Sequence, residues 1–395
     1  MSSGGQSPPS LDAISLAQSS RALPAAARYS PGMSSPPPST SAFSLKLATE
    51  RKPRPKDGEL VFGRSFTDHM AIVDWEEGRG WFDPRVVPYG PLVLDPAAAV
   101  LHYGQEMFDG LKAFRGADGQ IRCFRLDRHC RRMHDGGERL CIPAIDQGLM
   151  RDAILELVRA DRDWVPAAPG TALYIRPTII ATEPFLGVRP AKRFTFFVIA
   201  SPVGAYSGEV FSPVRILVED KYVRAATGGL GGVKAGANYV ASLRAAEDAN
   251  ARGYAQVLWT DAHEHTYLEE VGTMNVVVRI GDEFVTPPLE GSILAGVTRD
   301  SVITLLRDWG QMVSERPLGM EELITAHRAG KLREVFGCGT AAVITPVGVL
   351  GWKGEDITIG DGKPGETARR LYDGITAIQY ARAPDRHGWM TAVER

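Results

Sequence analysis

One lysine lies in a stretch that otherwise carries almost no charge. Between Ala225 and Tyr239, Lys234 is the only ionisable side chain besides Tyr239 itself, and glycines surround it at positions 228, 229, 231, 232 and 236. Burial lowers the pKa of a lysine, and a neutral amine near pH 7 can form a Schiff base with an aldehyde. The glycines let the backbone approach a flat ligand closely. The stretch indicates a nucleophilic amine, although a solvated lysine in a glycine-rich connector would have the same pattern.

The residues after Lys234 predict a helix. Asn238 can cap it, and Gly253 can end it. Between these two residues, apolar positions recur at helical spacing, at Tyr239, Val240, Leu243, Ala246 and Ala249. We therefore expect Lys234 in the loop just before a helix.

Two adjacent acids form a second candidate group. Glu269 and Glu270 end a predicted strand directly before Val271 and Gly272. An aldehyde cofactor with a pyridine ring withdraws electrons only when its ring nitrogen is protonated, and a buried carboxylate keeps that proton in place. Neighbours on a strand face opposite ways, so only one of the two can serve. A solvated acidic pair is the alternative interpretation.

Two glycine-containing segments could bind anions through the backbone. In the segment 292–302, a glycine precedes a predicted helix, so the N–H groups of Val297 and Thr298 are free to bind phosphate. In the segment 337–343, the N–H groups of Thr340 and Ala341 could bind a carboxylate. Each signal is weak alone, because most helix starts bind nothing and small residues also serve close packing.

Composition excludes several classes of function. The chain has 395 residues, 44% of them hydrophobic, and a net charge of −2, so no nucleic-acid or membrane partner is indicated. No apolar run reaches the roughly 18 residues of a membrane helix. The four cysteines have no zinc spacing, and His263 and His265 lack a third ligand nearby, so we expect no metal. A soluble, cytoplasmic protein is expected.

The order of the segments predicts an α+β protein with two domains. Residues 1–50, rich in Ser, Pro and Ala, are expected to be a disordered extension, with an organellar targeting segment as the alternative. Residues 51–200 are expected to form a small α/β domain, 201–213 an interdomain loop and 214–395 a larger, strand-rich domain. In the first domain we expect strands at 91–95, 120–126, 171–180 and 193–200, a helix capped by Asp127, and a helix at about 150–160.

Taken together, the motifs resemble the branched-chain amino acid aminotransferases. The matching stretches occur in that family's order: HYGQEMFDGLKAFRG (102–116), LYIRP (173–177), EPFLGVRP (183–190), GGVKAGANY (231–239), EEVGTMN (269–275), LAGVTR (294–299) and GCGTA (337–341). The resemblance runs from about Phe62 to near the C-terminus. It implies the fold type IV architecture of pyridoxal 5′-phosphate enzymes, with a small α/β domain and a larger domain containing a barrel-like sheet. It also implies a homodimer.

The resemblance assigns roles to single residues. Lys234 resembles the lysine that holds the cofactor as a Schiff base and moves the proton of the substrate. Glu270 matches the partner of the pyridine nitrogen, and Tyr239 resembles the tyrosine that binds the phenolic oxygen. Arg132 aligns with the phosphate-binding arginine, with Arg131 as the fallback. The resemblance also places Thr273 near the ring, Val297 and Thr298 at the phosphate, and Thr340 and Ala341 at the substrate carboxylate, with Thr340 also counted among the cofactor-binding residues.

The implied reaction needs a pocket for two kinds of side chain. Leucine, isoleucine or valine must enter in one half-reaction, and glutamate or its 2-oxo acid in the other. Phe62, Tyr103 and Tyr174 resemble the pocket's aromatic walls, which suit the apolar side chains. Arg176 could bind the glutamate carboxylate through a bidentate ion pair. A ping-pong transamination follows from this resemblance.

Other functions stay open on the sequence. D-amino acid aminotransferases and 4-amino-4-deoxychorismate lyases share the lysine and the glutamate. The amino-acid sequences of the motifs nevertheless favour the branched-chain group. A binding protein that kept the fold without catalysis is an alternative from another class. The retained lysine argues against it, because a buried lysine is costly unless it is used.

Overall fold

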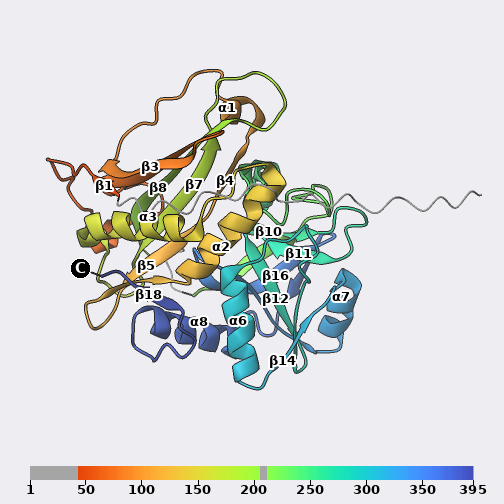
Figure 1. The fold of residues 1–395 in the computed structure, drawn as a ribbon. Coiled ribbons are helices and arrows are strands. Elements are labelled where there is room, and N and C mark those ends of the chain that lie inside the picture. Colours follow the sequence, from red (N-terminus) through yellow and green to blue (C-terminus); the bar gives the residue numbers. More distant parts are fainter. Residues whose placement is uncertain (1–42, 205–210, 395) are drawn as a thin grey trace, which may run out of the picture. The chain divides into compact units, whose positions relative to one another are not determined.

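The computed structural model describes residues 43–204 and 211–394, which belong to one compact unit. Two β-sheets form this unit, with helices packed against them (Figure 1). Most of the predicted extension, residues 1–42, lies outside the described residues. The predicted connector also lies partly outside them, because residues 205–210 are not described.

The first sheet contains nine strands among the described residues, in the order β1-β3-β2-β8-β7-β5-β6-β18, with β4 paired to β7. Only β1 runs parallel to its neighbour, and the other pairings are antiparallel. The last strand returns from the C-terminus to this sheet. The bounds are β1 Ser44–Leu45, β2 His69–Glu76, β3 Gly80–Pro88, β4 Glu106–Phe108, β5 Leu111–Arg115, β6 Ile121–Phe124, β7 Ala172–Ala181, β8 Arg193–Val203 and β18 Met390–Ala392.

Helices α2 and α3 cover the first sheet. Their apolar faces join the strands in one core that includes Met133, Ile154 and Phe196. Burial of such side chains contributes about 1.5–3 kcal/mol each. The helices and short 3-10 turns of this region are η1 Asp57–Glu59, α1 Ala99–Tyr103, α2 Leu126–Gly137, η2 Glu138–Leu140, α3 Gln147–Ala160 and η3 Arg162–Trp164.

The second sheet closes on itself. Its strands follow the order β11-β10-β9-β16-β15-β12-β13-β14, and β11 also pairs with β12, so the path from β11 to β12 forms a ring. A closed ring leaves no free edges among its own strands. The bounds are β9 Val214–Val218, β10 Gln256–Thr260, β11 Leu268–Val271, β12 Met274–Ile280, β13 Glu283–Thr286, β14 Met312–Glu315, β15 Leu332–Gly339, β16 Val343–Trp352 and β17 Glu355–Thr358, which pairs with β16.

Apolar side chains join the two sheets. One core cluster contains Phe114 and Tyr174 from the first sheet, Phe336 from the second, and Leu305 and Leu371 from helices α6 and α8. Figure 1 shows the N-terminal end of α2 beside the start of α6, where Arg125 makes an ion pair of 2.6 Å with Asp300. The helices of this half are α4 Gly236–Val240, α5 Leu243–Ala251, α6 Val297–Asp308, α7 Met320–Arg328 and α8 Glu366–Gln379.

Most of the strands and helices expected in the first half are confirmed, and two expectations are wrong. The segment 91–95 forms no strand, and Val93 is 96% exposed, so its apolar residues are not part of a core. Asp127 does not cap α2, because the helix already begins at Leu126. Its N-cap is Arg125, which has a positive φ and no capping side chain.

Ordered chain begins before residue 51. Strand β1 lies within the segment assigned to the extension and pairs with β3. The Ala48 N–H donates to Nε2 of His69 at 2.8 Å, and Nδ1 of His69 lies 2.6 Å from Asp161. These buried polar partners fix the segment against the first sheet, which its composition did not reveal.

Glu334 ties β15 to the start of α8, and its removal tests this joint. The side chain is buried, and it accepts N–H bonds from Thr367 and Ala368 and an ion pair from Arg279 at 3.1 Å. Because Glu334→Ala leaves these donors without an acceptor, we expect a loss of about 2–3 kcal/mol in the free energy of unfolding, measured in urea. The exposed Glu355→Ala is the control, and equal midpoints for both variants would contradict the assignment.

Candidate active site

Lys234 lies where the two sheets meet. It precedes α4, and its Nζ donates to the Tyr239 hydroxyl at 2.6 Å. The Phe108 ring, from β4 of the first sheet, has its centroid 5.1 Å from the same nitrogen. The Phe108 N–H also donates to the Lys234 carbonyl at 3.0 Å. The expected place of Lys234, in a loop before a helix, is confirmed.

The surroundings of Lys234 favour its neutral form. Burial lowers its pKa to about 7, and the nearby Arg132 guanidinium acts in the same direction. Burial also raises the pKa of Tyr239, so its hydroxyl keeps its proton. The lowered pKa makes the neutral, nucleophilic form of Lys234 accessible near neutral pH.

The helix after Lys234 differs from the prediction. Asn238 does not cap it but lies within the short α4, and its amide donates to the carbonyls of Leu230 and Val233 at 2.8 and 2.9 Å. These bonds fold the glycine-rich loop back onto the helix. The Gly236 N–H donates to Glu106, and a Cβ at Gly236 would collide with that carboxylate. The absence of a side chain at Gly236 lets the Glu106 carboxylate contact the backbone here.

Both acids of the predicted pair are buried. Glu270 accepts a hydrogen bond from the Leu294 N–H at 2.8 Å and lies 3.4 Å from Arg224. Burial raises the pKa of Glu270, and Arg224 opposes this shift. Burial also raises the pKa of Glu269, one of whose oxygens has no hydrogen-bond partner among the described residues. The alternative of a solvated acidic pair is wrong.

Arg132 is held at the mouth of a cavity. Its guanidinium binds Asp109 through two bonds, of 2.9 and 2.7 Å, and donates to the Ala295 carbonyl at 3.0 Å. His129 lies 2.8 Å from the same carboxylate. Arg132 and His129 hold the pKa of the buried Asp109 well below its usual range. Arg131, the fallback, is instead exposed and lies 3.6 Å from Asp135.

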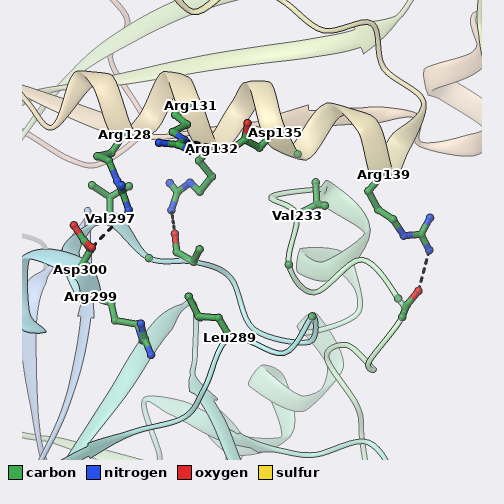
Figure 2. A pocket seen from close by; sticks show the side chains of 17 residues that line it. Arg128, Arg131, Arg132, Asp135, Arg139, Val233, Leu289, Val297, Arg299 and Asp300 are labelled. Atoms are coloured by element: carbon green, nitrogen blue, oxygen red, sulfur yellow. Dashed lines mark hydrogen bonds and ion pairs between the residues drawn. The ribbon is translucent and has the colours of Figure 1, made fainter. Parts of the chain in front are cut away.

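The cavity beside Arg132 has a volume of about 650 Å³. Figure 2 shows Arg128, Arg131 and Arg132 of α2 along one side, with Val297 of α6 opposite. Val297 is the first residue of α6 and Thr298 the second, and both are buried. Free N–H groups at a helix start favour an anion, and the neighbouring guanidinium adds positive charge. This end of the site is suited to phosphate.

Aromatic rings and a guanidinium lie on the other side of Lys234. Arg176 donates to the Tyr174 hydroxyl at 3.0 Å, and its guanidinium lies 4.5 Å from the centroid of the Phe108 ring. Its Nε is buried and has no hydrogen-bond partner among the described residues. Phe62 packs edge-on against Tyr174, at 4.8 Å between centroids. The structure thus brings these predicted pocket residues together.

The turn at Thr340 and Ala341 connects β15 and β16. The Lys112 ammonium, from β5 of the first sheet, donates to the Ala341 carbonyl at 2.6 Å. The sequence analysis missed Lys112, as it missed Asp109, Phe108 and Arg224. The sequence did contain a signal for two of these residues, because Asp109 and Lys112 are charged residues in an otherwise apolar run at 107–114.

Two predicted site residues lie apart from this group. Tyr103 ends α1, is 45% exposed and contacts the ring of His102. Thr273 is exposed in the turn between β11 and β12. Within the described ranges 43–204 and 211–394, no cluster of His, Cys, Asp or Glu could hold a metal ion. No helix in those ranges is long and apolar enough to cross a membrane.

Comparison with known proteins gives one consistent family. Residues 106–349 match the family Amino-transferase class IV. The chain is 50% identical to branched-chain-amino-acid aminotransferase 2 of Bacillus subtilis, over 88% of this chain and 96% of the relative. It is 48% identical to the branched-chain-amino-acid aminotransferase of Mycobacterium tuberculosis, over 84% and 92% of the two chains.

Solved structures agree with this result. The Escherichia coli branched-chain amino acid aminotransferase superposes with a TM-score of 0.68 at 26% identity, over 82% of this chain and all of that one. The branched-chain aminotransferase of Thermoproteus uzoniensis with norvaline gives 0.66 at 25% identity, over 82% and 100%. A further branched-chain amino acid aminotransferase, solved with pyridoxamine 5′-phosphate, gives 0.68 at 29% identity, over 82% and 99%. The chain therefore belongs to the class IV aminotransferases and, within them, to the branched-chain-amino-acid aminotransferases.

Proposed function

We propose that this protein exchanges the amino group between branched-chain L-amino acids and glutamate, with pyridoxal 5′-phosphate as its cofactor. The observation that carries the proposal is the Lys234 amine, which is buried, has a pKa of about 7 and is bonded to Tyr239. The relatives named above support the choice of substrates. We further propose that the protein acts in the cytoplasm.

The residues around Lys234 fit this cofactor. When bound, pyridoxal 5′-phosphate supplies an aldehyde carbon and a ring that accepts electrons from the substrate. The phosphate would be held by Arg132 and by the N–H groups of Val297 and Thr298. Arg132 uses three of its five N–H donors on Asp109 and Ala295, and one of its amino groups also lies 3.4 Å from His129, so at least one donor remains for an anion. Gly231 and Gly296 pack directly against Ser292 and Asn275, so a Cβ at either position would collide with these residues.

Each side chain then has one task. Lys234 receives the proton from the substrate Cα and returns it, which its pKa near 7 permits in both directions. Glu270 would hold a proton at the ring nitrogen of the bound cofactor, and Arg224, 3.4 Å away, keeps the carboxylate in place. The Tyr239 hydroxyl, bonded to Lys234, orients the amine. Water is excluded by the aromatic rings of Phe108 and Tyr174.

The two substrates would use the same pocket in turn. Phe62, Tyr174 and Phe108 offer an apolar wall to leucine, isoleucine or valine. Arg176 offers a guanidinium to the side-chain carboxylate of glutamate, and its unpartnered Nε leaves a donor for that anion. The proposed order is ping-pong, because the amino donor must leave as its 2-oxo acid before the acceptor enters.

We propose that the active form is a homodimer. Apolar side chains are exposed near α1, including Leu101 (58%) and Tyr103 (45%), and a nearby loop exposes Leu186 (65%) and Val188 (91%). The Ala98–Pro184 bridge joins the two segments. An exposed apolar patch of this kind marks an interface. Tyr103 would then be covered by the second copy.

Lys234→Ala tests the central residue. Protein loaded with pyridoxal 5′-phosphate should change its absorbance to that of the amine form when L-leucine is added, and 2-oxoglutarate should reverse the change. In the variant, the rate of this absorbance change should fall by at least about 10³-fold. Because the amine is neutral above its pKa, the rate of cofactor capture by the unloaded wild type should rise with pH and level off above about 7. If no branched-chain amino acid changes the absorbance of the loaded wild type, the lyase or the D-amino acid reaction would be favoured instead.

Glu270→Gln tests the acid at the ring nitrogen, and Glu269→Gln is its matched control. Both side chains are buried neighbours on β11. We expect the first variant to lose about 10²-fold or more in kcat, because an amide cannot hold the ring proton. The second should keep kcat within about threefold, since Glu269 faces the opposite side of the strand. Equal losses in both variants would contradict the assignment.

Arg176→Gln tests how glutamate is recognised. The variant should lose about 30-fold or more in kcat/KM for glutamate, because its side-chain carboxylate loses a charged partner. The kcat/KM for leucine should change by less than about fivefold. Steady-state rates with both substrates give the ratio of kcat/KM for glutamate to kcat/KM for leucine. Arg189→Gln, at a surface ion pair with Glu183, is the control. A parallel loss for both substrates would indicate that Arg176 only supports the fold.

A further inference from the structure

A second buried lysine, Lys112, contacts the turn between β15 and β16. Lys112 is the second residue of β5 and is 9% exposed. Its ammonium crosses to the second sheet and donates to the Ala341 carbonyl at 2.6 Å. The residues are 229 positions apart in the chain, so the contact joins the two halves of the site.

The charge of Lys112 has no counterpart within residues 43–204 and 211–394. Among the described residues, no carboxylate lies within ion-pair distance of its ammonium, whereas Arg132, Arg224 and Arg299 each have one. Burial lowers the pKa of Lys112 to about 8, so most of the side chains still carry the charge at pH 7. Burying a charge without a partner is costly. A cation kept in this position is therefore suited to an anion that arrives with a ligand.

The neighbours of Lys112 identify where that anion would sit. Lys112 lies directly opposite Tyr174 in the β5–β7 register, so both side chains are on one face of the sheet. Arg176, two residues further along β7, shares this face. The carbonyl that Lys112 binds belongs to the turn whose N–H groups, at Thr340 and Ala341, are expected from the family resemblance to bind the substrate carboxylate. The ammonium is therefore in direct contact with that turn.

We propose that Lys112 supplies the positive charge that binds the α-carboxylate of the amino acid and 2-oxo acid substrates. The two cations of the pocket then have separate tasks. Lys112 serves the carboxylate that every substrate carries, and Arg176 serves the second carboxylate that only glutamate carries. This assignment deepens the proposed aminotransferase function and rests on it.

A purely structural role for Lys112 makes a different prediction. If the side chain only holds the Ala341 carbonyl, its loss would weaken the binding of charged and neutral ligands alike. If its charge binds the carboxylate, only charged ligands lose affinity. A pair of ligands that differ in this one group separates the two roles.

The experiment uses 4-methylpentanoate and 4-methylpentanamide, which share the leucine side chain and have no amino group to transfer. Their dissociation constants are measured by calorimetry with protein loaded with pyridoxal 5′-phosphate. Wild type is compared with Lys112→Gln, which keeps a donor for the carbonyl, and Lys112→Arg, which keeps the charge. Lys192→Met, at an exposed ion pair with Glu77, is the control.

We expect Lys112→Gln to bind the acid about 30-fold or more weakly while its affinity for the amide stays within about threefold. Lys112→Arg should recover most of the affinity for the acid, and Lys192→Met should match wild type. An unchanged ratio of acid to amide affinity in Lys112→Gln overturns the proposal, even if both affinities fall. Failure of the proposed function is a separate result, because wild type would then fail to transaminate leucine.

Discussion

The burial of one titratable amine is the constraint on which the site depends. Lys234 can reach a pKa of about 7 only because apolar and aromatic groups replace water around it. That requires the chain on both sides of the lysine to pack closely. Gly231 fits against the Ser292 backbone, where any side chain would collide, and Gly236 lies against the Glu106 carboxylate. Asn238 then uses its amide to hold the loop carbonyls that the glycines leave without helical partners.

The second constraint is the balance of charge around that amine. Arg132, Arg176, Arg224 and Lys112 surround the site. Asp109 and Glu270 contact two of these cations, and Glu106 interacts electrostatically with Arg176. This excess of positive charge is costly to desolvate in the chain alone, so the arrangement is suited to ligands that bring negative charge. A phosphorylated cofactor and carboxylate substrates have that property. The chain also separates the cations spatially, since Arg132 lies on α2 while Lys112 and Arg176 lie on neighbouring strands of the first sheet.

The sequence predicted the parts of the site that depend on local chemistry. A lone lysine among glycines, acids at the end of a strand and a glycine before a helix are visible within about ten residues, and Lys234, Glu270 and Val297 lie in the expected elements. Contacts between distant segments could not be predicted in this way. The bond from Lys112 to Ala341 depends on how two sheets meet, and the pairing of Arg132 with Asp109 depends on α2 crossing β4. Asn238 was predicted to be a helix cap, but it bonds to loop carbonyls. Asparagine suits both roles, so the residue type alone does not distinguish them.

The position of Arg176 explains how one pocket can accept unlike side chains. Its guanidinium lies over the Phe108 ring and bonds to the Tyr174 hydroxyl, so it is part of an aromatic wall rather than a free charge. A guanidinium is planar and weakly hydrated, and an apolar side chain can pack against its face at small cost. A carboxylate can instead bind at its edge, where the buried Nε has no partner among the described residues. A lysine at this position would be a compact, strongly hydrated charge, and it would favour glutamate at the expense of leucine.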